Sequence, residues 1–115
     1  MKAAAIDLGT NAFRCLIRNI DSNYDTDIKI RYFVGLGKFL DKNNKLNLPA
    51  EYYSALDNIF NVISQNCVKK IHIVGTSVFR DSLNKNEILL DFKNRYKQEL
   101  NIIDPKTEAQ LTSLG

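Results

Sequence analysis

The sequence predicts an α/β domain built on a mixed five-stranded sheet, with its elements in the order βββαβαβα. Two observations lead to this fold class. The first 35 residues form short strand-like runs separated by turn residues, which is typical of antiparallel strands. In the rest of the chain, segments of helical periodicity alternate with short apolar runs. That order predicts a mixed sheet with helices on its faces.

Three antiparallel strands are expected at residues 2–7, 13–20 and 27–35. The loop at 21–26 consists almost entirely of residues that favour turns. The third strand alternates most clearly, because apolar Ile28, Ile30, Tyr32 and Val34 are interleaved with Lys29, Arg31 and Phe33. This period predicts a strand with one buried face.

A helix of about four turns is expected to begin at Pro49, because proline suits the first turn of a helix. The apolar residues at helical spacing are Tyr52, Leu56, Ile59, Phe60 and Ile63. Residues 71–74 then form a short continuous apolar run, which is the pattern expected for a strand in the middle of a sheet.

The last part of the chain predicts two more helices around one brief strand. Asn84 and Glu87 form a capping pair before a second helix. The inner face of that helix is expected to carry Ile88, Phe92 and Tyr96. The strand at 101–103 is followed by Asp104 and Pro105, which are typical of the N-cap and first position of a helix. This third helix carries Ala109, Leu111 and Leu114.

Composition excludes several classes of protein. With 115 residues and 44% hydrophobic residues, the chain can bury a core, which excludes a disordered protein. The chain has 16 Lys and Arg residues and 13 Asp and Glu residues, which gives a net charge of +3. This charge is too small to be typical of a nucleic-acid-binding domain. The apolar start is interrupted by Asp7, so no signal peptide or membrane span is expected and we expect a cytoplasmic protein. Cys15 and Cys67 are expected to be reduced, buried thiols.

The turn after the first strand has the residues of a phosphate-binding hairpin. Gly9 lets an anion approach the backbone N–H groups beside it, and Thr10 and Asn11 add side-chain donors. Asp7 can hold a divalent metal such as Mg²⁺ directly or through water. Arg14 offers a bidentate clamp for phosphate. The alternative is a plain hairpin in which these residues only form the turn.

Two further groups of polar residues are expected at the same edge of the sheet. After the strand at 71–74, Thr76 and Ser77 offer hydroxyls and Arg80 offers a planar fork of donors. The alternative there is a strand-to-helix turn with a weak Arg80–Asp81 surface pair. Glu108 falls in the first turn of the third helix, where it either complements the helix dipole or acts on an attacking water.

Three segments together resemble the exopolyphosphatase and guanosine pentaphosphate phosphohydrolase (Ppx/GppA) family. They are residues 5–14 (AIDLGTNAFR), 75–81 (GTSVFRD) and 108–115 (EAQLTSLG), in the family's order and spacing. Residues 34–37 and the helix after them are similar as well. The resemblance therefore covers nearly the whole chain. It implies a ribonuclease H-like fold of the actin-like ATPase class, with an active cleft between two such domains.

The resemblance also implies roles for single residues. Asp7 would lie near the metal, which is usually Mg²⁺. Thr10, Asn11 and Arg14 would line the phosphate-binding turn, and Arg80 would contact phosphate. Glu108 would be the catalytic base on water. The implied reaction releases orthophosphate from inorganic polyphosphate or guanosine pentaphosphate, and it needs positioning and charge stabilisation more than covalent help.

The chain departs from the family pattern in two ways. Thr107 and Gln110 stand where the family commonly has a second acid and an arginine around the catalytic glutamate. The family's second phosphate loop and second domain do not follow within the chain. We therefore expect residues 1–115 to be a single N-terminal domain, either a naturally truncated protein or a piece cut from a longer one. We expect this domain to be inactive until a second domain or a partner chain completes the cleft. The oligomeric state stays open, with a homodimer as one alternative.

Two other functions remain compatible with these residues. An ATP-binding kinase or chaperone of the actin-like class would share the turn from Asp7 to Thr10. It would not require the second segment, which runs from Thr76 to Asp81. A non-catalytic domain would keep the fold and lack the chemistry.

Overall fold

A mixed five-stranded sheet with the strand order β3-β2-β1-β4-β5 forms the centre of the computed structural model, which describes residues 1–21, 27–104 and 106. The strands are β1 (Lys2–Leu8), β2 (Phe13–Asn19), β3 (Ile28–Tyr32), β4 (Lys70–Gly75) and β5 (Asn101–Ile102). The first three are antiparallel, whereas β4 runs parallel to both β1 and β5. The predicted fold class is therefore confirmed. The helix expected after Asp104 lies outside the described residues.

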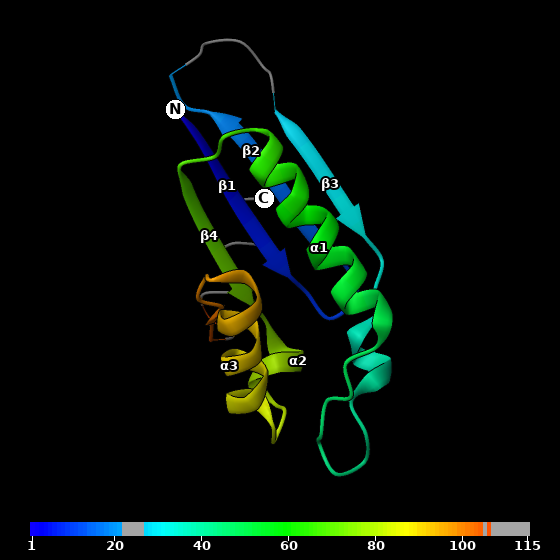
Figure 1. The fold of residues 1–115 in the computed structure, drawn as a ribbon. Helices are drawn as coiled ribbons and strands as arrows, with labels where there is room; N and C mark the ends of the chain where they lie inside the picture. Colours follow the sequence, from blue (N-terminus) through cyan, green and yellow to red (C-terminus); the bar gives the residue numbers. More distant parts are fainter. Residues whose placement is uncertain (22–26, 105, 107–115) are drawn as a thin grey trace.

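Four helical segments connect these strands: η1 (Leu36–Phe39), α1 (Ala50–Gln65), α2 (Ser77–Arg80) and α3 (Lys85–Tyr96). Figure 1 shows α1 lying across one face of β1, β2 and β3. The predicted amphipathic face of α1 is confirmed, with only Phe60 less than fully buried. The side chains that α1 buries are those of Tyr52, Ala55, Leu56, Ile59 and Ile63.

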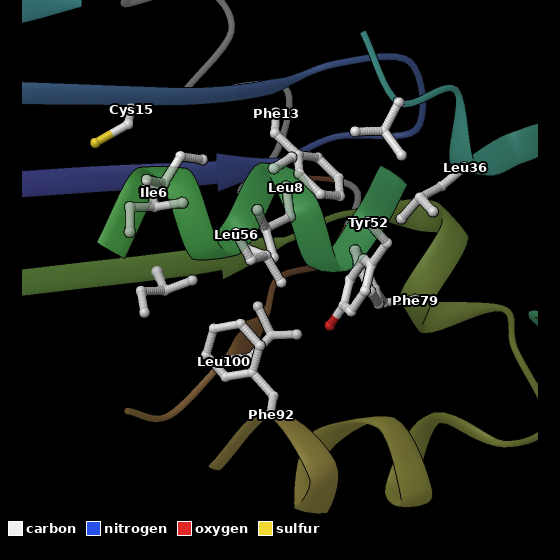
Figure 2. Close-up of a cluster of buried hydrophobic side chains, with 14 of the residues drawn as sticks. Ile6, Leu8, Phe13, Cys15, Leu36, Tyr52, Leu56, Phe79, Phe92 and Leu100 are labelled. Carbon is white, nitrogen blue, oxygen red and sulfur yellow. The ribbon is translucent and has the colours of Figure 1, made fainter. Parts of the chain in front are cut away.

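The core lies between this face of the sheet and the helices (Figure 2). Alternate side chains of β1 and β2 point into it, which is the expected consequence of the strand period of two. Helix α3 packs against α1 through aromatic rings: the Phe60 centroid lies 4.7 Å from that of Tyr96 and 6.1 Å from that of Phe92. These stacked and edge contacts fix α3 beside α1.

Two strand predictions are corrected by the topology. The middle strand of the sheet is β1, whereas β4 has only the two-residue β5 beyond it. β4 is still an interior strand, paired with both β1 and β5, but His72 is exposed, so its two faces are not both buried along its length. The strand expected at 27–35 ends at Tyr32, because the chain then turns back to donate hydrogen bonds to the β1–β2 turn.

The predicted capping pair of α3 is wrong. Asn84 is the N-cap residue, but its side chain makes no capping hydrogen bond. Its Oδ1 instead accepts from the N–H of Leu46 and its Nδ2 donates to the carbonyl of Leu46, each at 2.9 Å. The amide therefore holds the loop before α1 against the start of α3, a contact between residues 38 positions apart.

The two cysteines differ, which corrects the expectation that both are buried. Cys15 is only 2% exposed on β2, and burial raises the pKa of its thiol to about 11. Cys67 is exposed where the chain leaves α1 with a left-handed φ of 53°. Both thiols are free.

We expect a thiol-reactive dye at pH 8 to label one cysteine of the native chain quickly. At that pH a thiol with a pKa near 11 is about one thousandth thiolate, and Cys15 is also shielded. Counting modified thiols before and after unfolding in denaturant checks this expectation. Cys67→Ser should remove the fast phase. A fast phase that persists in Cys67→Ser would contradict the buried position of Cys15.

Candidate phosphate-binding site

The turn between β1 and β2 is closed by its own backbone. The N–H of Gly9 donates to the carbonyl of Ala12 at 3.0 Å. A Cβ on Gly9 would lie 2.9 Å from that carbonyl oxygen, so any side chain there would force the turn to shift. Glycine is therefore required by this close approach, and the tight turn predicted from the sequence is present.

The segment after β3 supports the turn from a second side. The N–H of Gly35 donates to the carbonyl of Asn11 at 3.0 Å, and the N–H of Gly37 donates to the carbonyl of Thr10 at 3.2 Å. A Cβ on Gly37 would lie 2.8 Å from the Thr10 methyl group. Neither glycine was predicted as part of the site. Their Gly-x-Gly spacing is the signal that could have indicated them.

The second predicted segment meets this turn. The Oγ1 of Thr10 and the Oγ of Ser77 lie 3.1 Å apart, in hydrogen-bond distance, although the residues are 67 positions apart. A backbone hydrogen bond joins the same two segments, because the N–H of Thr76 donates to the carbonyl of Leu8 at 3.4 Å. Thr76 is only 6% exposed, whereas Ser77 is half-buried and more open to a ligand. Two hydroxyls from different segments therefore lie side by side.

Asp7 and Arg14 face each other across β1 and β2. They are directly paired in the register, so their side chains lie on the same face of the sheet. This face points away from the core side chains of β1 and β2. Asp7 is half-buried, with its Oδ1 shielded from solvent, and Arg14 is exposed. A carboxylate and a guanidinium therefore flank the turn. Asn11 is exposed within it.

Arg80 lies on the other side of the turn, toward β5. Its Nη1 donates to the carbonyl of Ile103 at 2.7 Å, while its Nε is 4.0 Å from Asp81, the outer limit of an ion pair. Arg80 is half-buried and Asp81 is exposed. A backbone carbonyl is therefore one of the partners that position this guanidinium. Glu108, the predicted base, lies outside the described residues.

The donor set around the turn fits a metal that is bound only partly by protein. No group of three or more His, Cys, Asp or Glu side chains with metal-binding geometry occurs in the described part of the chain. Mg²⁺ typically uses one or two carboxylates and completes its shell with water and substrate phosphates. A single half-buried carboxylate, that of Asp7 at the end of β1, is compatible with that requirement. Within the described residues, no helix has the length and apolar character needed to cross a bilayer.

Comparison with known proteins places this geometry in context. Residues 27–115 match the Ppx/GppA phosphatase family. A guanosine-5'-triphosphate,3'-diphosphate pyrophosphatase of Vibrio cholerae is 32% identical over 109 residues, which are 92% of this chain and 22% of that protein.

Two solved structures share the fold. An exopolyphosphatase from Cytophaga hutchinsonii superposes with a TM-score of 0.85 at 25% identity, covering 96% of this chain and 36% of that one. The Aquifex aeolicus member of the Ppx/GppA family superposes with a TM-score of 0.83 at 23% identity, covering 94% and 36%. The chain thus spans about a fifth to a third of the length of these relatives. Because the family match covers well over half of its residues, this chain belongs to the Ppx/GppA phosphatase family.

Proposed function

We propose that this chain supplies one wall of the phosphate-binding cleft of a phosphoanhydride hydrolase. The reaction would release orthophosphate from inorganic polyphosphate or guanosine pentaphosphate, the two substrates that the family resemblance implies. Support comes from membership of the Ppx/GppA phosphatase family and from the names of the relatives. Because the chain spans only part of those relatives, we propose that a second domain or partner chain completes the cleft.

The contact between Thr10 and Ser77 carries this proposal. It joins two segments that the sequence separately predicts to bind phosphate, and it leaves two hydroxyl groups 3.1 Å apart at one edge of the sheet. Phosphoryl transfer depends on positioned donors around the transferred group, and here the donors are set by backbone pairing on both sides. The parallel pairing of β1 with β4 brings the two segments together at their strand ends, where ligands commonly bind in α/β sheets.

The charged side chains around the turn would stabilise and orient the anhydride. In this proposal the guanidinium groups of Arg14 and Arg80 contact phosphate oxygens, and the Ile103 carbonyl keeps Arg80 in place. Asp7 would hold Mg²⁺, which supplies charge neutralisation on the phosphate oxygens when bound. Glu108 would orient the attacking water and accept its proton.

Calorimetry on the 115-residue chain tests the phosphate-binding part of this proposal. We expect tripolyphosphate with Mg²⁺ to bind, and Thr10→Val and Ser77→Ala each to weaken binding about tenfold, because each removes one hydrogen bond to a charged ligand. Thr10→Val keeps the methyl group against which Gly37 packs, so the turn itself should persist.

Ser64→Ala is the matched control, because Ser64 is an exposed serine at the far end of α1. It should bind with the affinity of the unmodified chain. Undiminished binding by both Thr10→Val and Ser77→Ala would contradict the proposed site. Tight ATP binding that is lost only on changing the first turn would instead favour the kinase or chaperone alternative.

A further inference from the structure

Arg31 lies beside the candidate site, although the sequence pattern predicted no function for it. It is the direct partner of Arg14 in the register of β2 and β3, and Arg14 is the direct partner of Asp7. Directly opposed residues of antiparallel strands share a face, with Cα atoms about 4.5–5.5 Å apart. Both arginines are exposed. Two arginine side chains therefore leave neighbouring strands at the same level and on the same face, close to the phosphate-binding turn.

Across β1, β2 and β3 this row holds one carboxylate, Asp7, and two guanidinium groups, so positive charge is in excess and Arg14 has a like charge on one side. Like charges directly opposite each other destabilise a sheet. Among the ion pairs of the described residues, neither Arg14 nor Arg31 takes part in one. Arg18, further along β2, shows the contrast, because Asp27 accepts from both its Nε and its Nη2, the latter at 2.7 Å. An anion placed between Arg14 and Arg31 would remove the repulsion.

The position of Arg31 is coupled to the turn through the residues after it. Its guanidinium carbon lies 5.8 Å from the centre of the Phe33 ring, which gives the side chain a neighbour on the same face. Two residues beyond Phe33, the N–H of Gly35 donates to the carbonyl of Asn11 in the turn. The same short segment thus carries Arg31 and supports the phosphate-binding backbone.

We propose that Arg14 and Arg31 form a guanidinium pair that binds a second phosphate of a linear phosphate chain, adjacent to the phosphate at Thr10 and Ser77. This inference rests on the proposed function and adds Arg31 to it as a further binding residue for the linked-phosphate anions named there. Guanidinium groups bind phosphate oxygens in a bidentate manner. An anion that reaches both sites should therefore bind more tightly than an anion that fills only one. Orthophosphate cannot occupy both positions.

Calorimetry with two anions tests the pair on the 115-residue chain. In Arg31→Gln, we expect affinity for tripolyphosphate to fall about tenfold, while affinity for orthophosphate stays within about twofold. Lys29→Gln is the matched control: Lys29 is exposed on the same face of β3, but its partner on β2 is Leu16 rather than a cation. It should change both affinities by less than about twofold. Equal affinity of Arg31→Gln and the unmodified chain for tripolyphosphate would overturn the inference.

Thermal unfolding in low salt without phosphate separates binding from a structural role. Relief of the repulsion should leave the Tm of Arg31→Gln unchanged or higher, and tripolyphosphate should raise that Tm less than it raises the Tm of the unmodified chain. A lower Tm without anion would show that Arg31 is structural.

The two proposals can fail separately. If Ser77→Ala weakens tripolyphosphate binding and Arg31→Gln does not, the inference is wrong and the proposed function stands. If only Arg31→Gln weakens it, the guanidinium pair binds anions but the Thr10–Ser77 site does not.

Discussion

Phe13→Ala is expected to lower the free energy of unfolding by about 3–5 kcal/mol, the usual cost of truncating a fully buried phenylalanine. Phe13 has no exposed surface, and its ring packs edge-on against Tyr52 of α1, with centroids 5.9 Å apart at 81°. It also begins β2, immediately after the phosphate-binding turn. The truncation would therefore leave a cavity where the sheet, α1 and the turn meet. Urea denaturation followed by circular dichroism measures the loss.

Phe33→Ala is the matched control, because it removes the same atoms from a side chain that is 78% exposed. Its effect should stay within about 0.5 kcal/mol, as for most surface substitutions. If Phe13→Ala does not fold, the smaller truncation Phe13→Leu should still show a clear loss. Equal losses in Phe13→Ala and Phe33→Ala would contradict the core described above.

Glu108→Gln is expected to reduce orthophosphate release by at least about 100-fold in a chain that also carries the second domain. Glutamine keeps the size of the side chain but cannot accept the proton of the attacking water. The rate should be measured with polyphosphate and with guanosine pentaphosphate, each with Mg²⁺. The Tm should stay close to that of the unmodified protein, because the change is isosteric.

Glu87→Gln is the control for this experiment. Glu87 is exposed in the first turn of α3, so its substitution removes the same charge at a distant position. It should leave the rate unchanged. Full activity in Glu108→Gln would remove Glu108 from the mechanism, whereas equal losses in both variants would point to net charge rather than to a catalytic base.

Elements with a clear local period could be predicted from the sequence. The apolar spacing of α1 identified its buried face, and the turn at Gly9 was recognised from its residue types. Predictions failed where a distant partner competes with a local one. Asn84 is a good N-cap residue by type, yet its side chain binds the Leu46 backbone 38 positions away. Cys67 is of a residue type that is usually buried, but it lies exposed where the chain turns after α1.

The sequence by itself determined the fold class, the order of the five strands with α1 and α3, and the residue types gathered at the turn, because strand and helix periods and glycine turns are local properties. The short helices η1 and α2 were not predicted, since four residues are too few to show a helical period. Only the tertiary structure decided that β1 is the middle strand and that Thr10 meets Ser77. It also decided that Arg14 stands opposite Arg31. Strand order and register depend on which segments bury their apolar faces together, and a shift of one residue would place Arg31 on the other face of the sheet.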